Sequence, residues 1–225
     1  MYQVISDQTD FIVISKSVNV HFHSQDGNAG VIAQAEADVG YKLYPVHRLD
    51  TPTSGLLIVA KSPQAANVFT KMFTEHKVQK YYLAIACGKP KKKQGLIIGD
   101  MAKSRRSMYK LLRTTENPAV TQFFSQSIAS GMRMYLLKPL SGKTHQLRVA
   151  LASIGVPILG DKLYGDELSD RCYLHAYSLY FTFLEQVYSF QQLPQFGKQF
   201  LLPECQQLMM NQWQSPNDLS WPSKD

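Results

Sequence analysis

Cysteine is scarce in this sequence, and long apolar runs are missing from it. The three cysteines, Cys87, Cys172 and Cys205, lie far apart and form no C-x-x-C pair, so we expect neither a disulfide framework nor a thiolate zinc site. No segment approaches the roughly 18 uninterrupted apolar residues of a membrane span, and the amino-terminal residues lack a basic region followed by an apolar run. We therefore expect a soluble, cytoplasmic protein with no membrane partner.

Several common catalytic signatures are also missing. The sequence holds no G-x-S-x-G elbow and no H-E-x-x-H motif, which excludes two large hydrolase classes. SGKT at 141–144 resembles the end of a phosphate-binding loop, but the first glycine of that motif would fall at Leu137, so we reject a nucleotide-triphosphate site. His21 and His23 alternate on an expected strand, yet no third ligand has a suitable spacing, so we expect no metal.

What the chain does have is an excess of basic residues, most of it in one segment. The formal net charge is +7, and the segment from Lys89 to Arg113 holds nine basic residues against one acid, Asp100. The remainder, with 15 basic and 16 acidic residues, is almost neutral. Such a segment is typical of a surface that binds a polyanion, because Lys and Arg that neutralise phosphates release condensed counterions. A solvated loop explains the charge equally well.

The hydrophobic pattern predicts an α+β fold. Apolar or alternating runs bounded by turn residues predict strands near residues 2–6, 11–15, 19–23, 56–60, 79–87, 107–113, 120–128, 132–139 and 176–184. Because several of these follow one another with no helix between them, we expect a mixed, largely antiparallel central sheet. A chain of 225 residues fits one domain, which we place at 1–225.

Four segments are expected to be helical. The clearest is 62–76, where Ser62 can cap the helix, Pro63 suits its first turn, and apolar residues form a stripe that includes Phe69 and Met72. The others are 29–39, which ends at Gly40, then 144–154, and 203–213 near the carboxyl end.

Polar residues gather in two segments beside these elements. The first, PVHRLDTPTSGLLIVAKS at 45–62, places His47, Arg48 and Asp50 at a turn that leads into an apolar strand. An acid in such a turn can stay ionised and face a cleft, or it can merely cap the turn. The second, 140–165, places basic residues around a helix N-terminus, which attracts anions; they are Lys143, His145 and Arg148.

The first polar segment carries a resemblance to a known family. HRLDTPTSG at 47–55 resembles the signature H-R-L-D-x-x-T-S-G of the RluA family of RNA pseudouridine synthases. Further stretches of the chain resemble other motifs of this family, in the same order. They are DFIVISKSVNVHFHS (10–24), KYYLAIACG (80–88), AVTQF (119–123), SGKTHQLRVALASIGVPILGDKLYG (141–165) and LHAYSLYF (174–181). The resemblance covers residues 5–181, and 185–225 follows no family pattern. Since the motifs begin almost at residue 1, the S4-like domain of many relatives is not expected.

The resemblance implies a reaction and a catalytic set. The implied fold is a single pseudouridine synthase-like domain, whose central sheet is flanked by helices and loops around a catalytic cleft. The implied reaction breaks the C1′–N1 bond of a uridine in ribosomal or transfer RNA, turns the base and rejoins it through C5, with no cofactor and no metal. By its position in the motifs, Asp50 corresponds to the family's nucleophile, and Arg148 corresponds to the cation that accompanies it. Tyr82 corresponds to the tyrosine that stacks on the base and transfers a proton.

The resemblance also implies RNA contacts. Leu174 corresponds to the apolar wall of the site, and Arg48 is the candidate to fill the space left when the uridine leaves its stack. His47, Lys143 and His145 are the further residues expected to contact RNA, together with the basic segment. We expect a monomer with no obligate protein partner.

Two other functions fit the same fold. One is an RNA-binding or folding-helper protein without turnover, and the other is a nucleic-acid glycosylase that stops after bond cleavage. The joint presence of Asp50, Tyr82 and Arg148 favours the synthase, because a protein that only binds RNA has no reason to retain all three.

Overall fold

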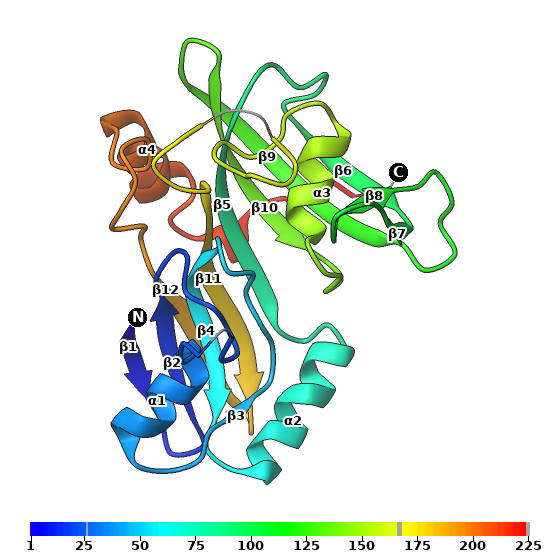
Figure 1. Cartoon of the computed structure of the whole chain (residues 1–225). Coiled ribbons are helices and arrows are strands. Elements are labelled where there is room, and N and C mark those ends of the chain that lie inside the picture. The colour runs from blue at the N-terminus through cyan, green and yellow to red at the C-terminus, as the bar shows by residue number, and fades with distance from the viewer. Residues whose placement is uncertain (26, 166–167, 224–225) are drawn as a thin grey trace. The chain divides into compact units, whose positions relative to one another are not determined.

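The apolar runs of the chain form strands, and helices separate some of these strands in the sequence (Figure 1). The expected α+β class is therefore confirmed. The structure is a computed structural model that describes residues 1–25, 27–165 and 168–223. These residues fall into two compact units. Unit 1 comprises Met1–Gln79 and His175–Gln192, and unit 2 comprises Lys80–Leu174 and Leu193–Asp225. The single domain at 1–225 stays a prediction.

Unit 1 holds a mixed sheet with the strand order β1-β2-β4-β11, in which β12 and β3 pair at the side with β11 and β4. Neighbouring strands are antiparallel except β4 and β11, which run parallel with His175 opposite Ser54. Gly55 has φ +108° and faces the backbone of Ala176, so a side chain at Gly55 would collide with that strand. The strands are β1 (Tyr2–Asp7), β2 (Phe11–Lys16), β3 (Tyr44–Pro45), β4 (Ser54–Ala60), β11 (Leu174–Phe183) and β12 (Gln186–Gln191).

The core of unit 1 lies between this sheet and helix α2 (Pro63–Thr74). The Ser62 hydroxyl accepts a hydrogen bond from the Ala65 amide at 3.1 Å, as the sequence predicts. Ala65, Phe69 and Met72 recur on one face of the helix and pack on apolar residues of β2, β4 and β11. Helix α1 (Val31–Val39) ends at Gly40, as predicted, where φ is +77°.

Unit 2 holds an antiparallel sheet in the order β5-β10-β9-β6, a separate β7–β8 hairpin and helix α3, which contacts β8 (Figure 1). The elements before residue 193 are β5 (Gln79–Cys87), β6 (Gln94–Gly99), β7 (Met101–Lys103), β8 (Tyr109–Leu111), β9 (Ala119–Ala129), β10 (Met132–Pro139) and α3 (Gln146–Ser153). After residue 193 come α4 (Pro203–Gln207), a π-helical turn (Leu208–Gln212) and a 3₁₀ turn (Pro216–Asp218).

The carboxyl-terminal part of the chain packs on the sheet of unit 2. The Trp221 ring stacks on Tyr81 of β5 with the ring centroids 5.7 Å apart, and the Tyr81 hydroxyl donates to the Asn217 side chain at 3.0 Å. Gln122 of β9 donates to the backbone oxygen of Pro222 at 2.6 Å. Residues 193–223 are therefore integrated into unit 2, although the sequence offered no motif for them.

The predicted strand at 19–23 is wrong. Asn19 has φ +59°, which turns the chain just after β2, and the backbone oxygen of His21 accepts from the Val31 amide at the start of α1. The alternation of His21 and His23 therefore reflects no strand. The short strand β3 and the strands β6, β7 and β12 were not predicted, and the strand expected at 107–113 is limited to β8. Within the described ranges, no helix is both long and apolar enough to cross a bilayer.

Candidate functional site

Asp50 lies in a tight turn directly before the buried strand β4. The backbone oxygen of Asp50 accepts from the Thr53 amide at 3.0 Å, and Leu49 and Thr53 on either side are buried. Asp50 itself is half-buried, so its carboxylate sits at the boundary between the core of unit 1 and solvent. The turn is thus closed by the backbone of Asp50.

A buried lysine supports this turn. Lys16, at the end of β2, is 1% exposed, and its ammonium donates to the backbone oxygens of Ser17, Val20 and Thr51 at 3.0, 2.9 and 3.2 Å. Thr51 directly follows Asp50, so the ammonium of Lys16 fixes the backbone next to that acid.

A second contact holds the start of β4. Ser54 and His175 are both buried, and the Ser54 hydroxyl lies 2.8 Å from His175 Nδ1. His175 Nε2 lies 2.7 Å from the backbone oxygen of Gln192, an atom that can only accept, so Nε2 carries the proton. In the neutral imidazole, Nδ1 is then the acceptor and the Ser54 hydroxyl the donor. This chain of hydrogen bonds fixes the strand that begins four residues after Asp50.

The other predicted residues of this segment differ in their surroundings. His47 is half-buried, its Nε2 accepts from the Ile58 amide at 2.9 Å, and its ring lies 4.7 Å from that of Phe73. His47 therefore joins its segment to β4 and α2. Arg48 is exposed, so its guanidinium can reach a ligand in solvent.

Unit 2 contributes Tyr82 from strand β5 of its sheet. Tyr82 of β5 lies opposite Leu137 of β10 and is half-buried. Side chains alternate along a strand, so Lys80 and Tyr82 share one face while Tyr81 packs against Trp221 on the other. Burial lowers the pKa of Lys80. A partly buried ammonium and a phenol thus stand on the same face of β5.

Arg148 is held by a partner that the sequence did not reveal. Its Nε and Nη2 donate to the two carboxylate oxygens of Asp161, both at 2.7 Å, and the two side chains are 3% and 1% exposed. Asp161 Oδ1 also accepts from the Leu163 amide at 3.0 Å. This bidentate geometry fixes the plane of the guanidinium, which lysine at position 148 could not reproduce.

Of the remaining predicted residues of unit 2, Lys143 and His145 precede α3 in the sequence and Leu174 follows it. Lys143 donates to the Asn117 side chain at 2.8 Å, and His145, the residue before the helix, adopts φ +57° with Nδ1 2.9 Å from the Tyr164 hydroxyl. Leu174 is buried, and its backbone oxygen accepts from Arg171 at 3.2 Å.

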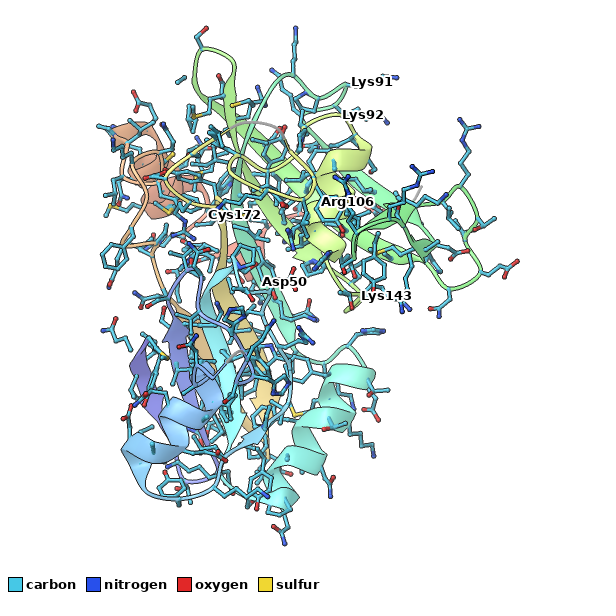
Figure 2. The ribbon with its side chains drawn as sticks, in the orientation of Figure 1. Asp50, Lys91, Lys92, Arg106, Lys143 and Cys172 are labelled. Atoms are coloured by element: carbon cyan, nitrogen blue, oxygen red, sulfur yellow. The ribbon has the colours of Figure 1, made fainter. Side chains whose placement is uncertain are left out.

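The basic segment divides into two exposed parts of unit 2. Lys91 and Lys92 lie in the loop between β5 and β6, and Arg106 lies in the β7–β8 hairpin; all three are labelled in Figure 2. Lys93 shares the loop, and Arg105 shares the hairpin tip. Exposure makes these charges available to a polyanion.

Three residues of these surroundings escaped the sequence analysis: Lys16, Asp161 and Tyr164. Each lies within a stretch that resembles the family, but each looks ordinary by residue type. The available signals were a lysine ending an apolar strand, and an acid in the turn GDKLYG, 160–165, thirteen residues after Arg148.

Comparison with known proteins gives a consistent result. The model of a family described as RNA pseudouridylate synthase matches residues 10–153. An "Uncharacterized RNA pseudouridine synthase" of Haemophilus influenzae is 47% identical over 89% of this chain and 91% of its own length. The "Dual-specificity RNA pseudouridine synthase RluA" of Escherichia coli is 35% identical over 61% of this chain and 66% of its own length.

A solved structure resembles the whole chain. The structure titled "Human RNA Pseudouridylate Synthase Domain Containing 1" aligns over 100% of this chain and 97% of its own, with a TM-score of 0.79 and 24% identity. At that identity the likeness concerns the fold alone.

Proposed function

The chain belongs to the RluA-type RNA pseudouridine synthases, isomerases that act on uridine within RNA, and on that premise we propose that it modifies ribosomal or transfer RNA through Asp50. The observation that carries the proposal is the turn at 50–53 within HRLDTPTSG. Its acid is half-buried, its backbone is bound by the ammonium of Lys16, and the next strand is fixed by Ser54 and His175. An active carboxylate needs such a fixed position.

The proposed chemistry is an isomerisation, which leaves the elemental composition of the uridine unchanged. Asp50 assists cleavage of the C1′–N1 bond, the base turns, a bond forms between C1′ and C5, and the proton of C5 is lost while N1 gains one. Tyr82 stacks on the base and accepts or delivers a proton. Arg148, oriented by Asp161, is the cation that the family resemblance assigns to the reaction.

We assign the RNA contacts as follows. Arg48 is exposed and adjacent in sequence to the nucleophile turn, so it is the candidate to occupy the space of the extruded uridine. Leu174 provides an apolar wall, and the remaining predicted contacts to phosphate or base are His47, Lys143 and His145.

The test is tritium release from RNA labelled at uridine C5, with wild-type protein beside Asp50→Asn. We expect release by wild type with the base retained in RNA, and a loss on the order of 10⁴-fold or more for the variant, as for other enzymes without their nucleophile. Asp38→Asn, on the exposed face of α1, is the matched control.

The outcomes separate the candidate functions. Substantial isomerisation by Asp50→Asn would contradict its role as nucleophile, provided that circular dichroism and RNA affinity match wild type. Free uracil and abasic RNA would indicate a glycosylase. If the protein binds RNA taken from cells that lack pseudouridine synthases but releases no tritium from it, the protein only binds RNA.

We also propose that the protein works in the cytoplasm as a monomer. The three cysteines lie far apart in the sequence and form no C-x-x-C pair, which suits a reducing compartment. Light scattering after size exclusion tests the oligomeric state, and a mass of twice 25.5 kDa would contradict a monomer.

A further inference from the structure

Tyr164 connects three parts of unit 2 through one side chain. Its hydroxyl accepts from the Tyr109 amide of β8 at 2.8 Å and lies 2.9 Å from His145 Nδ1, just before α3. The guanidinium of Arg148, on α3, lies over the Tyr164 ring at 5.1 Å from its centre. The rings of Tyr109 and His145 also meet edge to face, with centroids 5.7 Å apart.

The same short turn presents both Tyr164 and the partner of Arg148. The Gly165 amide donates to the backbone oxygen of Asp161 at 2.9 Å, which closes a turn over 161–165. Within it, the Asp161 carboxylate binds the guanidinium edge and the Tyr164 ring covers its face. The orientation of Arg148 therefore depends on where this turn lies.

The β7–β8 hairpin carries exposed basic residues that could bind RNA, and it contacts the 161–165 turn through Tyr109 and Tyr164. Its tip, 104–108, exposes Arg105 and Arg106, and Arg106 is labelled in Figure 2. The tip is tightly built, because the Ser104 amide donates to Met108 at 2.8 Å. Tyr109, the first residue of β8, directly follows this tip, and its amide donates to the Tyr164 hydroxyl.

We propose that Tyr164 is a positioning residue that links the basic β7–β8 hairpin to Arg148, so that RNA held at Arg105 and Arg106 orients the guanidinium used in catalysis. The inference rests on the proposed synthase function. Its consequence is that charge at the hairpin tip affects the chemical step as well as affinity, and that it does so through one hydroxyl group.

Tyr164→Phe tests the link, because it keeps the ring over Arg148 and removes only the hydroxyl. Tyr188→Phe is the matched control. The Tyr188 hydroxyl donates a hydrogen bond to the side chain of Gln186, on the same strand, at 3.0 Å. Each variant is made with and without the paired change Arg105→Ala and Arg106→Ala. Single-turnover isomerisation is measured at saturating RNA, and RNA affinity is measured over a salt series.

We expect Tyr164→Phe and the paired arginine change each to lower the saturating rate by about 10-fold, within the usual range for coupled sites. Combined, they should cost no more than about 2-fold beyond either one, because both break the same link. On the Tyr188→Phe background, the arginine change should keep its full effect.

Losses that multiply to about 100-fold would overturn the proposal, since independent effects add in free energy. It is also overturned if Tyr164→Phe lowers the thermal midpoint while leaving the saturating rate unchanged, the result of a purely structural role. Wild-type turnover is measured first: absence of turnover sinks the synthase function and the link together, whereas turnover with multiplying losses sinks the link alone.

Discussion

The buried pair of Arg148 and Asp161 makes a sharp prediction about stability. In Asp161→Asn the side chain keeps its shape and can still accept from the Leu163 amide, but the negative charge is removed. Arg148, 3% exposed, then remains buried without the carboxylate that accepts two hydrogen bonds from it at 2.7 Å. The variant should therefore be clearly less stable than wild type.

The magnitude follows from the geometry of the pair. Removal of one partner from a buried ion pair costs about 3–5 kcal/mol. Asparagine can retain one hydrogen bond to the guanidinium, so we expect the lower end, about 3 kcal/mol. For a chain of this size, that corresponds to a Tm about 6–12 °C below that of wild type.

Thermal and urea unfolding followed by circular dichroism would measure the change. Asp38→Asn is again the control, because the Asp38 carboxylate bonds Tyr2 and Gln34 at the surface, and its loss should leave Tm nearly unchanged. An Asp161→Asn protein with the Tm of wild type would refute the reasoning, since it would mean that solvent or another group compensates the guanidinium as well as the carboxylate does.

Two further predictions concern the exposed lysines and a buried thiol. Replacement of Lys91–Lys93 by glutamine should weaken RNA binding and reduce the slope of log K against log salt by about 2–3, if each lysine neutralises one phosphate; an unchanged slope in filter binding would show that this loop does not contact RNA. Burial raises the pKa of Cys205 to about 12, so the thiolate is absent at pH 8.5. Iodoacetamide should label Cys205 only after unfolding in urea, and mass spectrometry of the native protein would reveal the contrary result.

The sequence predicted those elements whose stabilising contacts are local. Helix α2 follows from a cap at Ser62 and a stripe that includes Phe69, and both signals lie within fifteen residues of each other. The segment 19–23 has a similarly clear alternation, but its backbone groups pair with Val31 rather than with a neighbouring strand. Hydrophobic alternation records which side chains are apolar, and it does not record which partner the backbone will find.

The site divides in the same way. Asp50, Tyr82 and Arg148 were predicted as site residues because they stand in stretches that resemble a family. The residues that hold them were not identified, because their roles depend on pairs far apart in the chain: Lys16 binds the oxygen of Thr51, and Asp161 binds Arg148. No spacing rule specifies such a pair, since it exists only once the chain has folded.

The route of the chain through unit 1 has a consequence for synthesis on the ribosome. The turn of Asp50 is made early, but His175, which contacts Ser54, and Gln192, which contacts His175, come after the Lys80–Leu174 part of unit 2. Domains otherwise tend to fold as their residues emerge. Here the strand that follows Asp50 waits for the last quarter of the polypeptide, so a nascent or truncated chain that ends before residue 175 should lack the contact that fixes this strand, and partial products should be inactive.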